Sequence, residues 1–320
     1  MRHWHPRHTL YNYRRVRKTG RINVSPPIVL TAGFAVLSVI GMGLLLLPFS
    51  THEGTSVLAA LFSAVSAVTI TGLTTVDIGT TYTPIGQAIL IALVQIGGLG
   101  FVTLSVTAAL ALGKRISLQH QALAQEAFNQ TNVSTVRQIA YAMIKITFVI
   151  ELIGIVIFTL WWWQGTPFMQ ALGQGIFHGI SAFNNAGMSI STTQIIDYAG
   201  DPVIILGTTL LIILGGIGFS VIHDVRQKRN WRHLMPYTRI VIIGTLVLNL
   251  TGFCLIWLME RNNPATFAPL SISDQALAAW LQTITTRTAG FSSVIISELE
   301  DSTTVLMMLF MFIGGGSLSS

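Results

Sequence analysis

Long apolar stretches alternate with short polar segments along the whole chain. A helix needs about 20 apolar residues to cross about 30 Å of hydrocarbon. Six stretches are long enough, and we predict that each of them is a membrane-spanning helix: 27–48, 86–113, 138–163, 203–223, 238–259 and 304–320. The chain therefore reads as an integral membrane protein.

A shorter apolar stretch lies between the members of each successive pair of spans, at 57–69, 171–184 and 276–287. This length is more typical of a re-entrant segment, which enters the membrane and turns back, than of a crossing. The basic residues agree with this interpretation, because only an even number of crossings leaves Arg21 and Lys114 on the same side. The pattern predicts three units, each made of a span, a re-entrant helix and a second span.

The three short segments share a sequence pattern when they are aligned without gaps as 62–73, 177–188 and 280–291. Each has an aromatic residue ten positions before a glycine (Gly72, Gly187 or Gly290), a small residue directly before that glycine and a large apolar residue after it. Each following span has its own glycine cluster, at 97–100, 215–218 and 314–316. The units are therefore internal repeats.

An apolar half-helix that stops inside the membrane leaves carbonyl groups that are tolerated only beside a water-filled or ion-filled cavity. Its C-terminal end also carries about half a negative charge. Several such ends around one axis favour a cation, and extended segments beyond them would replace its hydration shell with carbonyl oxygens, as in potassium filters. The expected ion-binding residues are Thr69, Ile70, Thr71, Gly72, Asn184, Asn185, Ala186, Gly187, Thr288, Ala289 and Gly290.

We therefore expect an all-α integral membrane fold, with three tandem units around a pseudo-symmetric pore and no fourth unit in these 320 residues. The expected divisions are a basic cytoplasmic N-terminus (1–25), a first unit (26–115), a second unit (116–229) and a third unit (230–320) that is incomplete at its end.

Composition and charge agree with a membrane location. Only 9% of the residues are charged and 51% are hydrophobic, whereas about 25% of a soluble domain is charged. The formal charge of +6 does not indicate a nucleic acid partner, because the basic residues cluster at the ends of spans rather than on one soluble face. The positive-inside rule places these clusters, and the N-terminus, in the cytoplasm of a multi-pass protein. Cys254 is the only cysteine, so neither an intrachain disulfide nor a Cys/His metal site is expected.

Most of the acidic residues fall in the loops that this topology places outside. They would concentrate cations at the mouth of a pore, or they could reflect no more than the depletion of Lys and Arg from translocated loops.

The filter segments Thr-Ile-Thr-Gly-Leu (69–73), Phe-Asn-Asn-Ala-Gly-Met (183–188) and Thr-Arg-Thr-Ala-Gly-Phe (286–291) resemble the signatures of the Trk/Ktr/HKT potassium transporter superfamily. The chain looks most like its KtrB members. The resemblance implies potassium translocation across the plasma membrane without enzymatic activity, K+ and in some members Na+ as transported ions, a homodimer, and a cytoplasmic nucleotide-binding KtrA-like subunit. It also implies an intramembrane gate that begins at Gly314, Gly315, Gly316 and Ser317.

Two other interpretations remain open at this stage. One is a truncated, non-conducting fragment of such a subunit, because a three-sided filter would leave backbone groups exposed. The other is a secondary transporter with broken helices around a central site. The sequence also leaves open whether transport is channel-like or coupled to Na+ or H+. Three single residues also attract attention: Glu151 as an interhelical hydrogen-bonding residue or a functional acid, Arg287 as a brace behind the filter, and His178 as a packed polar residue.

Overall fold

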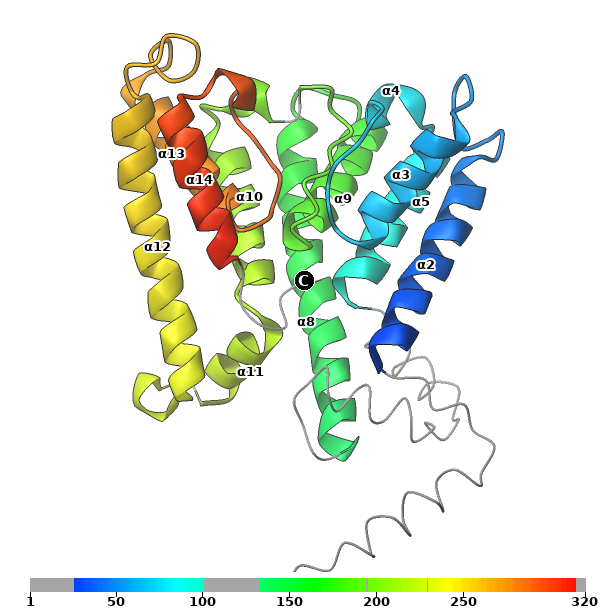
Figure 1. Cartoon of the computed structure of the whole chain (residues 1–320), viewed down its shortest axis with the longest axis horizontal. Coiled ribbons are helices and arrows are strands. Elements are labelled where there is room, and N and C mark those ends of the chain that lie inside the picture. The colour runs from blue at the N-terminus through cyan, green and yellow to red at the C-terminus, as the bar shows by residue number, and fades with distance from the viewer. Residues whose placement is uncertain (1–25, 101–132, 194, 229, 315–320) are drawn as a thin grey trace, which may run out of the picture.

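The computed structural model describes residues 26–100, 133–193, 195–228 and 230–314, which are largely helical (Figure 1). The first unit contains α2 (Pro26–Leu45), α3 (Val57–Val68), α4 (Ile78–Thr81) and α5 (Pro84–Gly98). The second contains α8 (Val133–Trp162), α9 (Phe168–Phe183), α10 (Pro202–Gly216) and α11 (Phe219–Lys228). The third contains α12 (Pro236–Glu260), α13 (Ile272–Thr285) and α14 (Asp301–Ile313). Short 3-10 helices lie in the connections, at Ile196–Tyr198, Trp231–His233 and Ile296–Glu298.

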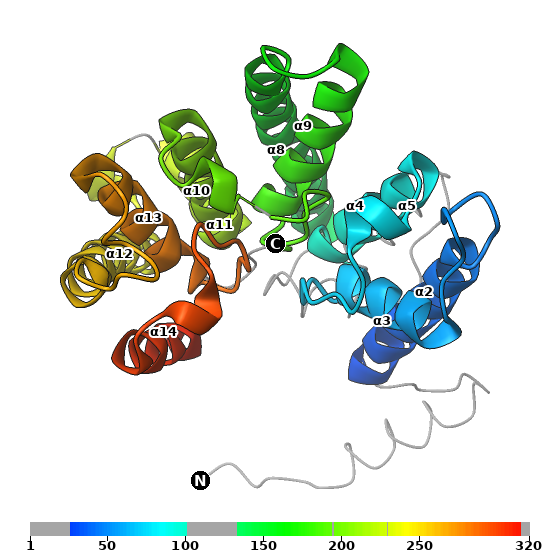
Figure 2. The ribbon, with the colours of Figure 1, turned by 90° about the horizontal axis from the view of Figure 1, so that it is seen from above.

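The helices α3, α9 and α13 form where the three re-entrant segments were predicted. Each packs against the first helix of its own unit, and α9 and α13 also pack against the second helix of the preceding unit. Seen from above, the three units follow an arc that is open on one side (Figure 2). This order of elements confirms the predicted all-α membrane fold. The predicted unit boundaries stay a prediction, and the one at 115/116 falls outside the described residues.

Side-chain caps explain where many of these helices begin. Thr83 and Asp201 accept hydrogen bonds from backbone N–H groups in the first turns of α5 and α10, and each is followed by a proline at the first helical position. Proline suits that position because its missing N–H would have no partner within the helix. Ser56 and Ser271 cap α3 and α13 in the same way.

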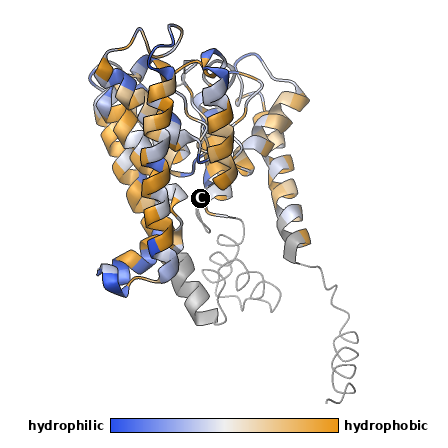
Figure 3. Ribbon diagram, turned by 60° about the vertical axis from the view of Figure 1, so that its left-hand side comes forward, coloured by the Kyte–Doolittle hydropathy of each residue, from blue (hydrophilic) through white to orange (hydrophobic). Residues whose placement is uncertain are grey.

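Apolar side chains cover the outside of the helices, as a lipid environment requires. On α8, for example, Leu152 and Ile153 are more than half exposed. Figure 3 shows hydrophobic colour along the helices and hydrophilic colour in the loops and near α11. Among the described residues, Ala142–Trp162 and Pro236–Glu260 are long and apolar enough to cross a membrane, and α10 with α11 adds a third candidate if that bent pair is one span.

The predicted continuous span at 203–223 is wrong. The helix stops at Gly216, and α11 leaves it at an angle of 91°. Gly218, at the break, has a φ of +93°, a conformation that glycine reaches without the steric cost of a β carbon. Of the predicted span at 86–113, the structure describes α5, which ends at Gly98, whereas residues 101–113 lie outside the described part.

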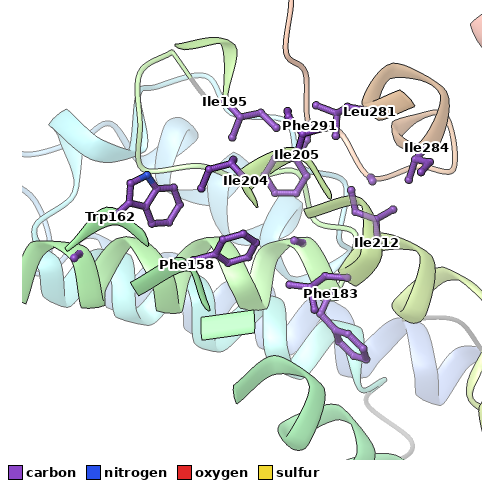
Figure 4. Close-up of a cluster of buried hydrophobic side chains, with 14 of the residues drawn as sticks. Phe158, Trp162, Phe183, Ile195, Ile204, Ile205, Ile212, Leu281, Ile284 and Phe291 are labelled. Carbon is purple, nitrogen blue, oxygen red and sulfur yellow. The ribbon is translucent and has the colours of Figure 1, made fainter. Parts of the chain in front are cut away.

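A large apolar cluster joins the second unit to the third (Figure 4). Phe158 and Trp162 of α8 and the isoleucines of α10 pack there with Leu281 and Ile284 of α13 and with Phe291, which follows the third filter glycine. The predicted filter segments of these two units are thus attached to one buried core.

Candidate functional site

The first two re-entrant helices end in the same hydrogen-bonded turn. At the end of α3, the Ile70 N–H donates to Ala67 O (3.4 Å) and the Thr71 N–H donates to Ser66 O (2.9 Å). At the end of α9, Asn185 N–H donates to Ala182 O (3.2 Å) and Ala186 N–H donates to Ser181 O (2.8 Å). This pair of bonds is a Schellman motif, which satisfies carbonyls that a helix end otherwise leaves unpaired.

The third helix ends in a variant of this turn. Arg287 N–H donates to Ile284 O (3.1 Å) and Ala289 N–H donates to Thr285 O (3.0 Å). A trans peptide unit is planar, with its N–H and C=O on opposite sides. In all three turns these N–H groups point back toward their own helix. The carbonyl group on the other side of each peptide unit therefore points away from that helix. These carbonyls belong to Thr69, Ile70, Asn184, Asn185, Thr286 and Thr288.

All three segments pass twice through the left-handed region of backbone space. The first passage is at Ile70 (φ +56°), Asn185 (φ +54°) and Thr288 (φ +66°), and the second is at the glycine two residues later. Asparagine is often found there, but a β-branched residue such as Ile70 or Thr288 is a genuine outlier. The prediction that these segments are extended is wrong, because each of them turns at two residues with positive φ. Strained residues of this kind cluster at functional sites.

The three segments meet one another at their glycines. A β carbon on Gly72 would lie 2.2 Å from the carbonyl oxygen of Ala186, and one on Gly187 would lie 2.6 Å from that of Ala289. A β carbon on Gly290 would come within 3.1 Å of the Gly187 Cα. The first two glycines therefore each pack on the carbonyl that precedes the next unit's glycine, and only a residue without a side chain fits there.

The ascending chain after each glycine is tied to its helix in the second and third units. Ser181 Oγ donates to Met188 O (2.7 Å), and Gln282 Nε2 donates to Ser292 Oγ (2.6 Å). All four of these residues are buried. These bonds fix both sides of the turn that contains the glycine.

The glycine clusters of the second helices lie directly behind the turns. Their regular spacing indicated internal repeats but did not predict this proximity. A β carbon on Gly97 would lie 2.3 Å from Val68 O at the end of α3, and one on Gly98 would lie 1.8 Å from Asn184 Oδ1. A β carbon on Gly216 would lie 3.2 Å from Asn185 Nδ2. The glycines therefore let α5 and α10 approach the filter segments closely.

Each second helix ends at one of these clusters. Gly100, Gly218 and Gly314 all have positive φ, so the helical path is interrupted at the same place in every unit. Of the predicted gate residues, Gly314 follows the end of α14, whereas Gly315, Gly316 and Ser317 lie outside the described residues.

The side chains three positions before the glycines differ in burial: Thr69 is exposed, whereas Asn184 and Arg287 are buried. Thr69 Oγ1 donates to Val65 O (2.8 Å) in its own helix. Asn184 Nδ2 lies 3.0 Å from Glu151 Oε1 and 3.1 Å from Gln95 Oε1. Arg287 donates through Nη1 to Thr245 Oγ1 (3.0 Å) and through Nη2 to Thr245 O (3.4 Å). Sequence reasoning had singled out Glu151 but not its partners, because residues 56 and 33 positions away have no local signature.

His178 and two of the loop acids, Asp77 and Asp201, are engaged in structural contacts. His178 Nε2 lies 2.7 Å from Thr208 Oγ1, and its ring packs edge-on against Phe158, Trp162 and Phe291. Asp77 and Asp201 cap α4 and α10. Among the described residues, no group of three or more His, Cys, Asp or Glu is arranged to hold a metal ion.

Comparisons with known proteins agree with this architecture. Residues 24–320 match the family model TrkH, described as a cation transport protein. The chain is 40% identical over 299 residues to Ktr system potassium uptake protein B of Bacillus subtilis (strain 168), covering 93% of this chain and 67% of that protein. It is 38% identical to the protein of the same name from Vibrio alginolyticus, covering 92% and 65%. It is 30% identical to the potassium/sodium uptake protein NtpJ of Enterococcus hirae, covering 95% and 68%.

The crystal structure of the potassium transporter TrkH from Vibrio parahaemolyticus has the same fold, with a TM-score of 0.68 at 22% identity, covering 94% of this chain and 59% of that one. This chain thus spans about two thirds of the length of the curated relatives named above. A family model that matches almost the whole chain and relatives of this identity lead to one conclusion: the chain is a membrane protein of the TrkH family of cation transport proteins.

Proposed function

We propose that this chain forms part of a pathway through which potassium ions cross the membrane. The observation that carries the proposal is the meeting of three turned segments, in which Gly72 and Gly187 each pack on the carbonyl preceding the next glycine. In this proposal, peptide oxygens of the three segments surround a shared centre, as they do in carbonyl filters, and the close packing of the segments supports it.

The ions would be held by backbone oxygens rather than by charged side chains. The carbonyls of Thr69, Ile70, Asn184, Asn185 and Thr288 point away from their helices, and Thr71, Ala186 and Ala289 precede the glycines. The C-terminal ends of α3, α9 and α13 add partial negative charge close to these oxygens. A dehydrated monovalent cation is the ligand that this arrangement suits best.

Potassium is the proposed substrate because the most similar relatives described above are named as potassium uptake proteins. One relative's name includes sodium, so sodium is proposed as the competing ion. Gly314 and the residues that follow it, Gly315, Gly316 and Ser317, are proposed as the start of a gate below the filter. No covalent chemistry is required.

The proposed setting is the plasma membrane, with the N-terminus in the cytoplasm. The basic residues on α11 and at the start of α12 lie at the same end of the molecule, where hydrophilic colour gathers (Figure 3). We also propose that the chain works as a homodimer with a cytoplasmic nucleotide-binding subunit of the KtrA type; the name "Ktr system" of its relatives supports a system with more than one component.

The proposal is tested by ion binding and by ion uptake. The purified chain should be stabilised against heating by K+ and Rb+ more than by equal concentrations of Na+ or choline, because a ligand that binds only the folded state raises its stability. The chain should also support Rb+ uptake in a bacterial strain that lacks its own potassium uptake systems. Equal stabilisation by all four cations together with no uptake would overturn the proposal.

A further inference from the structure

Behind the second filter segment, two buried polar side chains and a partly buried one, from three different elements, meet in a triangle. Glu151 of α8 is only 2% exposed, and both of its carboxylate oxygens face amide nitrogens. Its Oε1 lies 3.0 Å from Asn184 Nδ2, and its Oε2 lies 3.1 Å from Gln95 Nε2. Gln95 Oε1 closes the triangle at 3.1 Å from Asn184 Nδ2. The first unit is thereby connected to the second unit's filter.

The surroundings of the Asn184 amide fix its orientation. Its Nδ2 lies within 3.1 Å of three acceptors, namely Glu151 Oε1, Gln95 Oε1 and Ile180 O. Its Oδ1 lies against Gly98, where no donor of the described residues reaches it. The opposite orientation would set an oxygen against three oxygens. The two hydrogens of the Asn184 amide are thus shared among three acceptors, and Gly98 packs against its oxygen, so the side chain has one fixed orientation.

The equivalent positions of the other two units have different chemistry. Thr69 bonds within its own helix, and Arg287 places a buried guanidinium against Thr245 of α12. Within the described part of the chain, neither position is paired with an acid. A carboxylate therefore supports one filter segment alone, and the units are not interchangeable.

Burying an acidic group among apolar helices costs free energy, and a leucine would pack there without that cost. Glu151 nevertheless accepts a hydrogen bond from Asn184, a residue whose own backbone carbonyl belongs to the proposed filter segment. The close approach of Gly98 to Asn184, which any β carbon would prevent, leaves that side chain no room to turn away.

We propose that Glu151 is a positioning residue that determines ion specificity, because it holds Asn184 and thereby keeps the second filter segment at the spacing that favours K+ over Na+. This inference rests on the proposed function. Glu151 acts through Asn184 and does not itself contact the ion. Changes to the triangle should therefore lower the preference for K+ over Na+, and this loss should not follow from a loss of thermal stability alone.

The test compares three variants of the full chain. Glu151→Gln keeps the shape but turns an amide nitrogen toward a donor, either Asn184 Nδ2 or Gln95 Nε2. Glu260→Gln is the matched control, because Glu260 is also fully buried but bonds Asn263, Thr266 and the Glu300 N–H away from the filter. The triple change Glu151→Leu, Gln95→Leu and Asn184→Leu removes every polar group of the triangle while keeping approximate volume, which can be nearly neutral for stability.

Two readouts are measured for each variant: the difference in thermal stabilisation between K+ and Na+, and the Na+ concentration that halves Rb+ uptake. We expect Glu151→Gln and the triple leucine variant to lower the K+ over Na+ preference by about 10-fold, the size expected when charge-assisted hydrogen bonds are lost. Glu260→Gln should lower the unfolding temperature and leave the preference unchanged.

The outcomes separate the two proposals. If the unsubstituted chain shows no preference for K+ in either readout, the proposed function fails. If it does show one, and the folded triple leucine variant or Glu151→Gln keeps the same preference, Glu151 is a packing residue and this inference is overturned. A loss of preference equal in Glu151→Gln and Glu260→Gln would also overturn it.

Discussion

Gly72 lies so close to the carbonyl oxygen of Ala186 that a β carbon on Gly72 would come within 2.2 Å of it. The two residues belong to different units, so this contact joins the first filter segment to the second. Real β carbons essentially never come within 3.0 Å of another heavy atom. A substitution at Gly72 must therefore move one of the two segments.

Gly72→Ser is expected to lower the preference for K+ over Na+ more than Gly290→Ser does. Both glycines have positive φ, which costs other residues about 1–2 kcal/mol. However, the nearest atom to a β carbon on Gly290 is 3.1 Å away, so the local shift is smaller. Competition of Na+ with Rb+ uptake measures the effect. Gly244→Ser is the control, because a β carbon there meets nothing within 4 Å, and a similar loss in it would contradict the prediction.

Thr288→Asn should raise the free energy of unfolding by about 1 kcal/mol, because asparagine tolerates the left-handed conformation that Thr288 adopts at φ +66°. Thermal unfolding in detergent measures the change. Thr71→Asn serves as the matched control, since Thr71 has no positive φ and should gain nothing. An unchanged or lowered stability for Thr288→Asn would show that the turn is not strained there.

Thr245→Val should destabilise the protein by about 2 kcal/mol, whereas Arg287→Met should be nearly neutral. The first change leaves a buried guanidinium without the hydroxyl that accepts its hydrogen bond, and an unsatisfied charged group is costly. The second removes the charged group itself. Chemical unfolding of both variants measures the asymmetry. Equal losses would mean that the charge of Arg287 has a stabilising partner beyond Thr245.

Glu260→Ala should weaken the connection between α12 and α14 in the third unit by about 3 kcal/mol. The Glu260 carboxylate accepts hydrogen bonds from Asn263, Thr266 and the backbone N–H of Glu300, so it ties α12 to the start of α14. Limited proteolysis should therefore cut the 261–271 loop faster in this variant. Asp274→Ala is a suitable comparison, because Asp274 lies at an exposed helix start, and equally fast cleavage in it would contradict the prediction.

The position of the re-entrant helices could be predicted from sequence because two signals coincide there. The apolar stretches at 57–69, 171–184 and 276–287 are too short to cross a membrane, and each ends just before an aligned glycine. The structure places α3, α9 and α13 within a few residues of these bounds. Length and repetition are local properties of the chain, so no tertiary information was needed.

The break after Gly216 could not be predicted, because Ile217, Phe219, Val221 and Ile222 carry the apolar stretch past the glycines, as an unbroken span would. The triangle around Glu151 was hidden for another reason. Its members come from α5, α8 and the end of α9, and only the packing of two units brings them together. The left-handed conformation of Ile70 and Thr288 contradicts their intrinsic preference, so local sequence pointed away from it.

In each of the first two units, a hydrogen bond of the Schellman motif joins the turn after the re-entrant helix to the last turn of that helix, so the two cannot open separately. To exchange its amide hydrogen with solvent, Thr71 must release Ser66 O, and Ala186 must release Ser181 O. Each of these amides therefore reports on the last turn of a membrane-embedded helix as well as on the filter. Slow isotope exchange at these two positions would identify the turn as one of the most cooperative parts of the molecule, and its acceleration would signal a filter that has begun to unwind.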